Sequence, residues 1–135
     1  MALINWNESF SVNVREIDEQ HKKLAVMLNE LDDARKGGDE KAVLKTILVE
    51  LVAYAATHFR TEEKYFAQFG YPDTQNHKRE HASFIKRTAA FIEEFEVGKR
   101  ELTADVMDFL GEWWGEHILG ADKRYSRFFN ENGLK

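Results

Sequence analysis

Apolar residues recur every three or four positions along four stretches of the chain, and this spacing predicts four amphipathic α-helices. The first helix is expected from about Asp18 to Lys36, where a pair of glycines follows. Asp39 can cap the second helix, which ends before Gly70 and Pro72. Both helices therefore have a recognisable stop signal in the sequence.

The second half of the chain repeats the pattern. Asp73 or Thr74 can cap a third helix, which ends before Gly98. Thr103 can cap a fourth helix, and an aromatic stretch that starts at Tyr125 is expected to continue as a short C-terminal turn or helix.

No stretch alternates between apolar and polar residues with a period of two, so no sheet is expected. Four long helices with short joins favour an all-α fold, an antiparallel up-down-up-down four-helix bundle. We expect one domain spanning residues 1–135. The residues before the first helix, including Trp6 and Phe10, are expected to form a loop that packs on the bundle.

The apolar stripes of the four helices form the expected core. Their members are Leu24, Leu28, Leu31, Leu44, Ile47, Leu48, Leu51, Ala55, Phe59, Phe66, Phe69, Phe84, Ile85, Phe91, Ile92, Phe95, Val106, Phe109, Leu110 and Trp113. The five histidines of the chain fall on the same stripes, so their side chains are expected to point inward.

Composition and charge narrow the possible functions. Of the 135 residues, 43% are hydrophobic and 32% are charged, which is typical of a soluble globular protein. A net charge of −5, with both signs interspersed, argues against nucleic acid or an anionic membrane as a partner. No secretory signal or uninterrupted apolar span of about 20 residues stands out, so we expect a cytoplasmic monomer without membrane insertion. The absence of cysteine excludes disulfides, iron–sulfur ligation and thiolate zinc sites.

The histidines occur at suggestive spacings. His58 and Glu62 are four residues apart, as are His77 and His81, so each pair lies on one helix face and could share an ion. His21 stands on the first helix without such a partner. Each pair alone is a weak signal, because a spacing of four often arises by chance.

His117 and Asp122 are five residues apart, which on a regular helix separates them by about 140°. A π-bulge or local unwinding near Gly120 would bring the two side chains together, and such bulges often mark functional sites. The alternative is an Asp122 that lies on the surface at a frayed helix end.

A single histidine on a core stripe is usually a neutral residue with a hydrogen-bond partner. Five inward imidazoles and two carboxylates together would multiply the cost of burying polar groups, whereas metal coordination would satisfy all seven. A set without sulfur suits iron or manganese. Two six-coordinate ions offer about twelve positions, and five histidines, two bridging carboxylates and one bridging oxygen would fill all but about one. The open position, enclosed by apolar side chains, suits a small diatomic ligand.

Four motifs in fixed order make the chain similar to the hemerythrin family, in particular to its stand-alone bacterial members. The resemblance covers essentially the whole chain. Its motifs are Ile17-Asp18-Glu19-Gln20-His21, His58-Phe59-x-x-Glu62-Glu63, His77-x-x-x-His81 and His117-Ile118-x-x-x-Asp122-x-x-Tyr125.

The resemblance implies reversible O2 binding at a non-haem, oxo- or hydroxo-bridged di-iron centre, for oxygen storage or delivery to an oxygen-consuming enzyme. It implies that three histidines, His77, His81 and His117, hold one iron. His21 and His58 would hold the other iron, which keeps the open position. Glu62 and Asp122 would bridge the two ions.

The same resemblance assigns an apolar oxygen pocket. Its expected lining residues are Leu24, Phe59, Trp113, Trp114 and Ile118. Trp114 departs from the smaller aliphatic residue that is frequent in the family, so adjacent tryptophans could narrow the pocket or alter oxygen access.

Four other functions compete with oxygen storage. A ferritin-like oxidase would use Glu-x-x-His pairs, and no histidine here has a glutamate three positions before it. An oxygen or redox sensor would need a separate signalling partner, and a di-iron enzyme could act on peroxide or nitric oxide. A structural zinc site is disfavoured, because seven inward donors exceed the four that zinc prefers.

Overall fold

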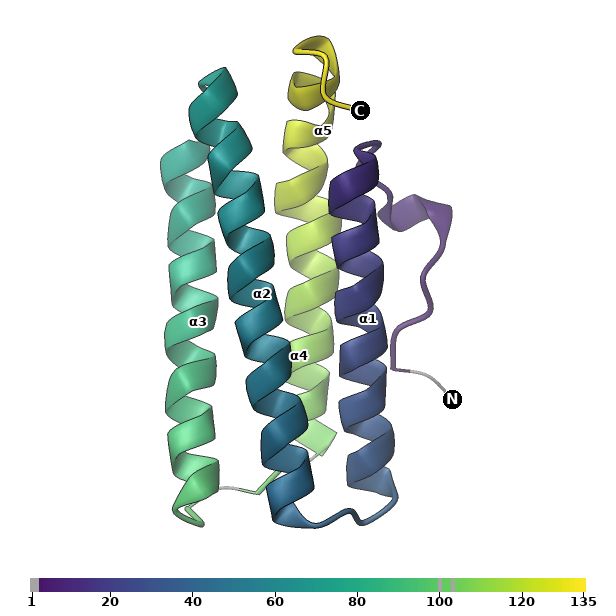
Figure 1. The fold of residues 1–135 in the computed structure, drawn as a ribbon, viewed down its shortest axis with the longest axis vertical. Coiled ribbons are helices and arrows are strands. Elements are labelled where there is room, and N and C mark those ends of the chain that lie inside the picture. The colour runs from purple at the N-terminus through teal and green to yellow at the C-terminus, as the bar shows by residue number, and fades with distance from the viewer. Residues whose placement is uncertain (1–2, 100, 103) are drawn as a thin grey trace.

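The computed structural model describes residues 3–99, 101–102 and 104–135 of the chain. Its elements follow the chain in the order η1 (Glu8–Phe10), α1 (Arg15–Lys36), α2 (Lys41–Phe69), α3 (Thr74–Glu96), α4 (Ala104–Glu116), η2 (His117–Asp122) and α5 (Lys123–Glu131). Figure 1 shows four antiparallel rods, the fourth of which is α4, η2 and α5 in unbroken succession. The predicted up-down-up-down bundle is confirmed, and the short C-terminal helix extends its fourth member.

The first helix begins three residues before the predicted Asp18, at Arg15. Asp18 holds the incoming loop: its carboxylate accepts hydrogen bonds from the Val12 backbone N–H at 2.8 Å and from the Ser11 hydroxyl at 2.6 Å. Asp18 therefore lies in the first turn of α1 and fastens the preceding loop to the helix.

The predicted N-caps succeed only in part. The residue before α2 is Glu40, and its side chain makes no capping hydrogen bond, so the cap predicted at Asp39 is wrong. Asp73 does precede α3, but its carboxylate accepts from the Asn76 side chain at 2.8 Å. Thr103 lies outside the described residues.

The glycine stop signals are confirmed. Gly70 ends α2 with φ of 71°, and its N–H donates to the Phe66 carbonyl at 2.8 Å. Gly98 follows α3 with φ of 79°, and Gly37 is the C-cap of α1. A side chain at either left-handed position would strain the backbone.

Two apolar clusters fill the bundle. The larger contains Leu24, Leu28, Leu31, Leu48, Leu51, Phe59, Phe84, Leu110, Trp114 and Ile118, with Trp113 half-buried against it. The smaller contains Val12, Val14, Ile17, Phe66, Tyr71, Tyr125 and Phe129. On α1, α2 and the fourth rod the candidate ligands lie where residues of the larger cluster give way to those of the smaller one, whereas α3 contributes to the larger cluster alone. The polar groups therefore form a layer between the two clusters.

The N-terminal loop packs on the bundle as predicted. Its backbone at Ile4 exchanges two hydrogen bonds of 2.8 Å with the Asn29 side chain of α1. Further along, the rings of Trp6 and Phe10 contact Trp114 edge-on, with centroids 6.4 and 4.8 Å away. The loop thereby covers the face where α1 meets α4.

Among the described residues, α2 is one helix that is long and apolar enough to cross a membrane by length and composition alone. Lys45 and Glu50 interrupt this helix, so it is not an uninterrupted apolar span of the kind that the sequence analysis found lacking. A single such helix is weak support for a span, because core helices pass the same test. Here α2 packs against both α1 and α3 and carries His58 and Glu62 on its buried side.

Gly70 offers a test of the helix stop. Gly70→Ala should reduce the free energy of unfolding by about 1 kcal/mol, because alanine is strained at a positive φ. Gly115→Ala is the matched control, since this glycine lies inside α4 and an added Cβ meets open space. The control should stabilise the protein by roughly 0.5–1 kcal/mol. Urea unfolding of both variants measures the difference, and equal effects would contradict the conformational argument.

Candidate metal centre

Seven side chains predicted as ligands meet inside the bundle. All five histidines and both carboxylates are buried, and Glu62 and Asp122 have no exposed surface at all. They form two sets, each with its ligand atoms within 4.8 Å of one another: Glu62, His77, His81 and His117, and then His21, His58, Glu62 and Asp122. The division of the histidines into three and two is the one that the family resemblance implies, and Glu62 belongs to both sets.

Asp122 faces both sets of histidines. One carboxylate oxygen, Oδ1, lies 2.8 Å from Nε2 of His77 and 3.0 Å from Nε2 of His117. The other oxygen, Oδ2, lies 3.0 Å from Nε2 of His21. The two oxygens therefore point to different groups, as expected of a carboxylate that bridges two ions.

Glu62 occupies a similar position from α2. Its Oε1 lies 3.2 Å from Nε2 of His58 and 3.2 Å from Nε2 of His81, which belong to different sets. Its Oε2 accepts a hydrogen bond from the buried hydroxyl of Tyr125. Glu62 thus has one oxygen between the two groups of histidines and one held by α5.

The turn that brings His117 and Asp122 together is π-helical. The segment η2 runs from His117 to Asp122, within the fourth rod and around Gly120. Hydrogen bonds from residue i to residue i+5 widen the turn, so residues five apart return to nearly the same face. The predicted π-bulge is confirmed, and Asp122 is buried instead of lying on the surface.

Gln20 fixes the orientation of the His58 ring. The Thr61 hydroxyl donates to the Thr57 carbonyl at 3.3 Å, so its oxygen accepts from the Gln20 amide nitrogen at 3.2 Å. The Gln20 oxygen then faces Nδ1 of His58 at 2.6 Å and accepts a hydrogen bond from its N–H. In the neutral ring, which is the form that binds a metal, the lone pair is then on Nε2, which points to the centre.

Glu63 has the same role for His81. Its Oε2 lies 2.9 Å from Nδ1 of His81, and a carboxylate can only accept a hydrogen bond there. The ring nitrogen that faces the centre, Nε2, again has the lone pair. Metal-binding histidines commonly have such a partner on the outer nitrogen.

The charges at the centre stabilise one another. Burial and the charge of Asp122 raise the pKa of the Glu62 carboxyl, but contacts with His58 and His81 outweigh them and hold it well below its usual range. Burial raises the pKa of Asp122 as well, while His117 and its other histidine neighbours lower it strongly. Burial lowers the pKa of His117, whereas Asp122 and Glu62 raise it to about 9.

The residues fit a metal by their unused atoms. Among the described residues, Nε2 of His77, His81 and His117, Oε1 of Glu62 and both oxygens of Asp122 are buried without a hydrogen-bond partner. Oδ1 of Asp122 lies within about 3 Å of Nε2 of His77 and of His117, but these pairs lack the geometry of a hydrogen bond. Cations bound between them would satisfy this converging set of donors.

Aromatic rings enclose the centre on the side of the larger cluster. Phe59 stacks on His81 at 4.0 Å and 9°, and Trp113 stacks on His117 at 4.5 Å and 12°. Leu24, Trp114 and Ile118 are buried in the same cluster. The predicted pocket residues thus belong to one apolar body, in which Phe59 and Trp113 contact candidate ligands directly.

Sequence reasoning did not assign roles to Gln20, Glu63 and Tyr125. All three stand inside the motifs that it singled out, next to a candidate ligand or three residues beyond one. Their position near candidate ligands in the sequence could have indicated a role at the centre. Only the packing shows which ring or carboxylate each one contacts.

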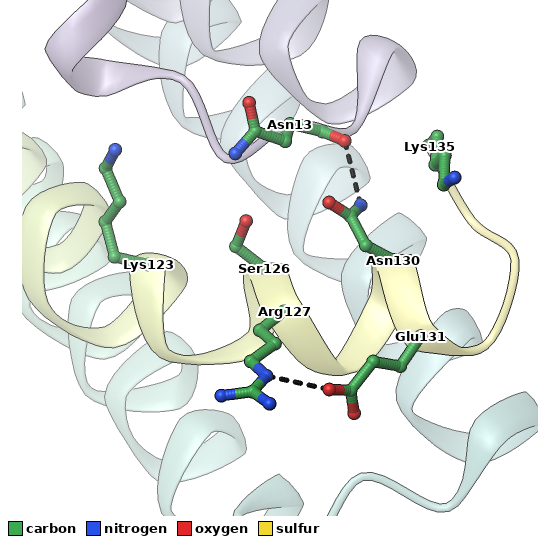
Figure 2. A pocket seen from close by; sticks show the side chains of 7 residues that line it. All are labelled: Asn13, Lys123, Ser126, Arg127, Asn130, Glu131 and Lys135. Carbon is green, nitrogen blue, oxygen red and sulfur yellow. Dashed lines mark hydrogen bonds and ion pairs between the residues drawn. The ribbon is translucent and has the colours of Figure 1, made fainter.

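A separate hollow of about 590 Å³ lies where the N-terminal loop meets α5 (Figure 2). It is lined by Asn13, Lys123, Ser126, Arg127, Asn130, Glu131 and Lys135. Arg127 pairs with Glu131 at 2.7 Å, and the Asn130 amide donates to the Asn13 carbonyl at 3.0 Å. Its walls contain none of the seven candidate ligands, and much of its polar lining is already paired.

Comparison with known proteins agrees with the geometry. The family model for the hemerythrin HHE cation binding domain matches residues 12–128. A bacteriohemerythrin of Clostridium acetobutylicum is 36% identical over an alignment of 124 residues, and the match covers 89% of this chain and 96% of the relative. A bacteriohemerythrin of Methylococcus capsulatus is 34% identical over 126 residues, 93% of this chain and 95% of the relative.

Solved structures give the same result. The crystal structure of a wild-type hemerythrin has a TM-score of 0.87 at 33% identity and covers 93% of this chain and 97% of its own. A single-residue variant of hemerythrin reaches a TM-score of 0.90, also at 33% identity, over 94% of this chain and 97% of its own. The chain belongs to the hemerythrin family.

Proposed function

We propose that this protein binds O2 reversibly at a di-iron centre and serves to store oxygen or deliver it to an oxygen-consuming enzyme. The observation that carries the proposal is the pair of buried ligand sets that share Glu62. Its relatives are named bacteriohemerythrins, and the resemblance extends over most of each chain. We retain the interpretation of residues 1–135 as one domain that acts as a cytoplasmic monomer.

In the proposed arrangement, His77, His81 and His117 would hold one iron, and His21 and His58 would hold the other. Glu62 and Asp122 would contribute to holding both ions. The short distances from the two carboxylates to histidines of both groups support this assignment. The lack of cysteine and the oxygen- and nitrogen-rich donor set suit iron, which is the metal that family membership favours.

When bound, a pair of iron ions supplies the electrons needed to bind O2 reversibly. The protein's part is to hold the ligands rigidly and to limit access of water. Gln20 and Glu63 fix two imidazoles with their lone pairs inward. The apolar residues Leu24, Phe59, Trp113, Trp114 and Ile118 line the side where the oxygen pocket is proposed.

Tyr125 retains its proton beside the centre. Burial, and the charges of Asp122 and Glu62, raise the pKa of its hydroxyl well above the ordinary value. The hydroxyl therefore keeps its proton at neutral pH and remains a hydrogen-bond donor to Glu62. Few available protons and little water favour release of oxygen without oxidation of the centre.

The proposal is tested by the absorption spectrum of iron-loaded, anaerobically reduced protein before oxygen is admitted, after it is admitted and after it is removed. A visible charge-transfer band that appears and then disappears would establish reversible binding. Immediate and irreversible conversion to the ferric form would instead favour a sensor or an enzyme.

Glu62→Ala should reduce the iron content from about two ions per chain to one or none, because a bridging ligand of both sets is lost. Iron analysis of the purified variant measures this, and circular dichroism shows whether the bundle still forms. Glu50→Ala removes an exposed carboxylate from the same helix and should leave the iron content unchanged. Normal iron stoichiometry in Glu62→Ala would contradict the assignment.

Trp114→Leu should change the rates of oxygen binding and autoxidation by about tenfold, equivalent to about 1.4 kcal/mol in the barrier. The physical reason is that a smaller side chain opens the larger cluster next to Ile118. Trp6→Leu is the control, since Trp6 packs on the outer side of Trp114 from the loop. Stopped-flow rates equal to those of the unmodified protein would remove Trp114 from the pocket.

A further inference from the structure

The outer ring nitrogens of two candidate ligands are hydrogen-bonded to groups of different charge. Nδ1 of His58 contacts the neutral amide of Gln20 at 2.6 Å. Nδ1 of His81 contacts the carboxylate of Glu63 at 2.9 Å. His58 belongs to the two-histidine set and His81 to the three-histidine set, so one ring in each half of the centre has a partner of a different charge.

Both partners are held in place by the fold. The Gln20 amide is oriented by the Thr61 hydroxyl of the neighbouring helix α2, so it cannot turn its NH2 group toward His58 without losing that bond. Glu63 stands one residue after Glu62 on α2 and reaches His81 on α3. Its side chain is 30% exposed, so water screens its charge only in part.

A carboxylate acceptor on the outer nitrogen makes an imidazole a stronger electron donor than a neutral amide does. It also adds one negative charge close to the bound ion, where the effective dielectric is far below that of water. Both effects stabilise the higher oxidation state of a metal. They act on the three-histidine side, because Glu63 contacts the ring of His81.

We infer that Glu63 is a positioning residue that lowers the reduction potential of the metal held by His77, His81 and His117. Gln20, being neutral, leaves the potential of the metal held by His21 and His58 higher. The inference rests on the proposed di-iron function and adds to it that the two irons differ in potential through the charge of their outer partners.

The experiment is a potentiometric titration of the iron-loaded protein under anaerobic conditions, compared with three variants. Glu63→Gln keeps an oxygen acceptor for His81 but removes the charge. Gln20→Glu adds a charge at the matching place on His58. Glu50→Gln removes a charge from an exposed position of the same helix and serves as the control.

Glu63→Gln should weaken the preference of one iron for the ferric state by about tenfold, which raises one one-electron potential by about 59 mV. Gln20→Glu should lower the potential of the other step by a similar amount. The control should leave both potentials unchanged. Because the acceptor oxygen is retained in Glu63→Gln, a purely structural role of Glu63 would not move the potential.

Zinc-loaded protein supplies a readout independent of oxygen and redox chemistry. In its proton NMR spectrum, the Nδ1–H signal of His81 should move upfield in Glu63→Gln, while the signal of His58 stays in place. The metal-to-protein ratio of every variant is measured in the same samples.

The outcomes distinguish the proposed di-iron function from the inference about Glu63. Failure of the unmodified protein to bind two metal ions would overturn the proposed function. Normal metal content with unchanged potentials in Glu63→Gln would overturn only the inference. Equal shifts of both potentials would also overturn it, because the charge would then act on the whole centre and not on one half.

Discussion

Two fully buried carboxylates, Glu62 and Asp122, are the constraint on which the rest of the structure depends. Their charges repel each other, and removing them from water is costly unless positive charge or metal lies between them. The five imidazoles face them from all four rods, so the bundle can close only if each rod delivers its ligand at the same level. The apolar stripes stabilise the bundle, but the carboxylates decide how its rods align.

This requirement explains the layered interior. The larger apolar cluster lies on one side of the polar layer and the smaller cluster on the other, so both faces of the layer are sealed from solvent. Tyr125 connects the layer to the smaller cluster: its ring packs there, while its hydroxyl donates to Glu62. The packing of the ring and the hydrogen bond of the hydroxyl thus both fix the position of Tyr125, and a change in one would disturb the other.

Most of this architecture follows from sequence, because helical periodicity and burial obey simple rules. The stripes predict the four helices, and the spacing of five between His117 and Asp122 predicts the π-turn, since a regular helix would separate them. The predictions fail at the starts of helices, where several local arrangements of the backbone differ little in free energy. Asp18 secures the loop and does not start α1, and α2 begins without the cap expected from Asp39. The hydrogen-bond partners of His58 and His81 depend on how neighbouring helices pack. The spacing of residues along a single helix gives no information on that packing.

The π-turn shows how a locally unfavourable element is retained. Its wider turn is rarer than the α-helix, so the fourth rod would become regular if nothing opposed it. Regular winding would rotate the Asp122 carboxylate away from Nε2 of His77 and His117, so that these three side chains could no longer share a cation. Tyr125, three residues further, would lose Glu62 through the same rotation. Polar contacts on both sides of the turn therefore offset the free-energy cost of the irregular backbone. Metal binding would stabilise the turn further, because it requires the same geometry.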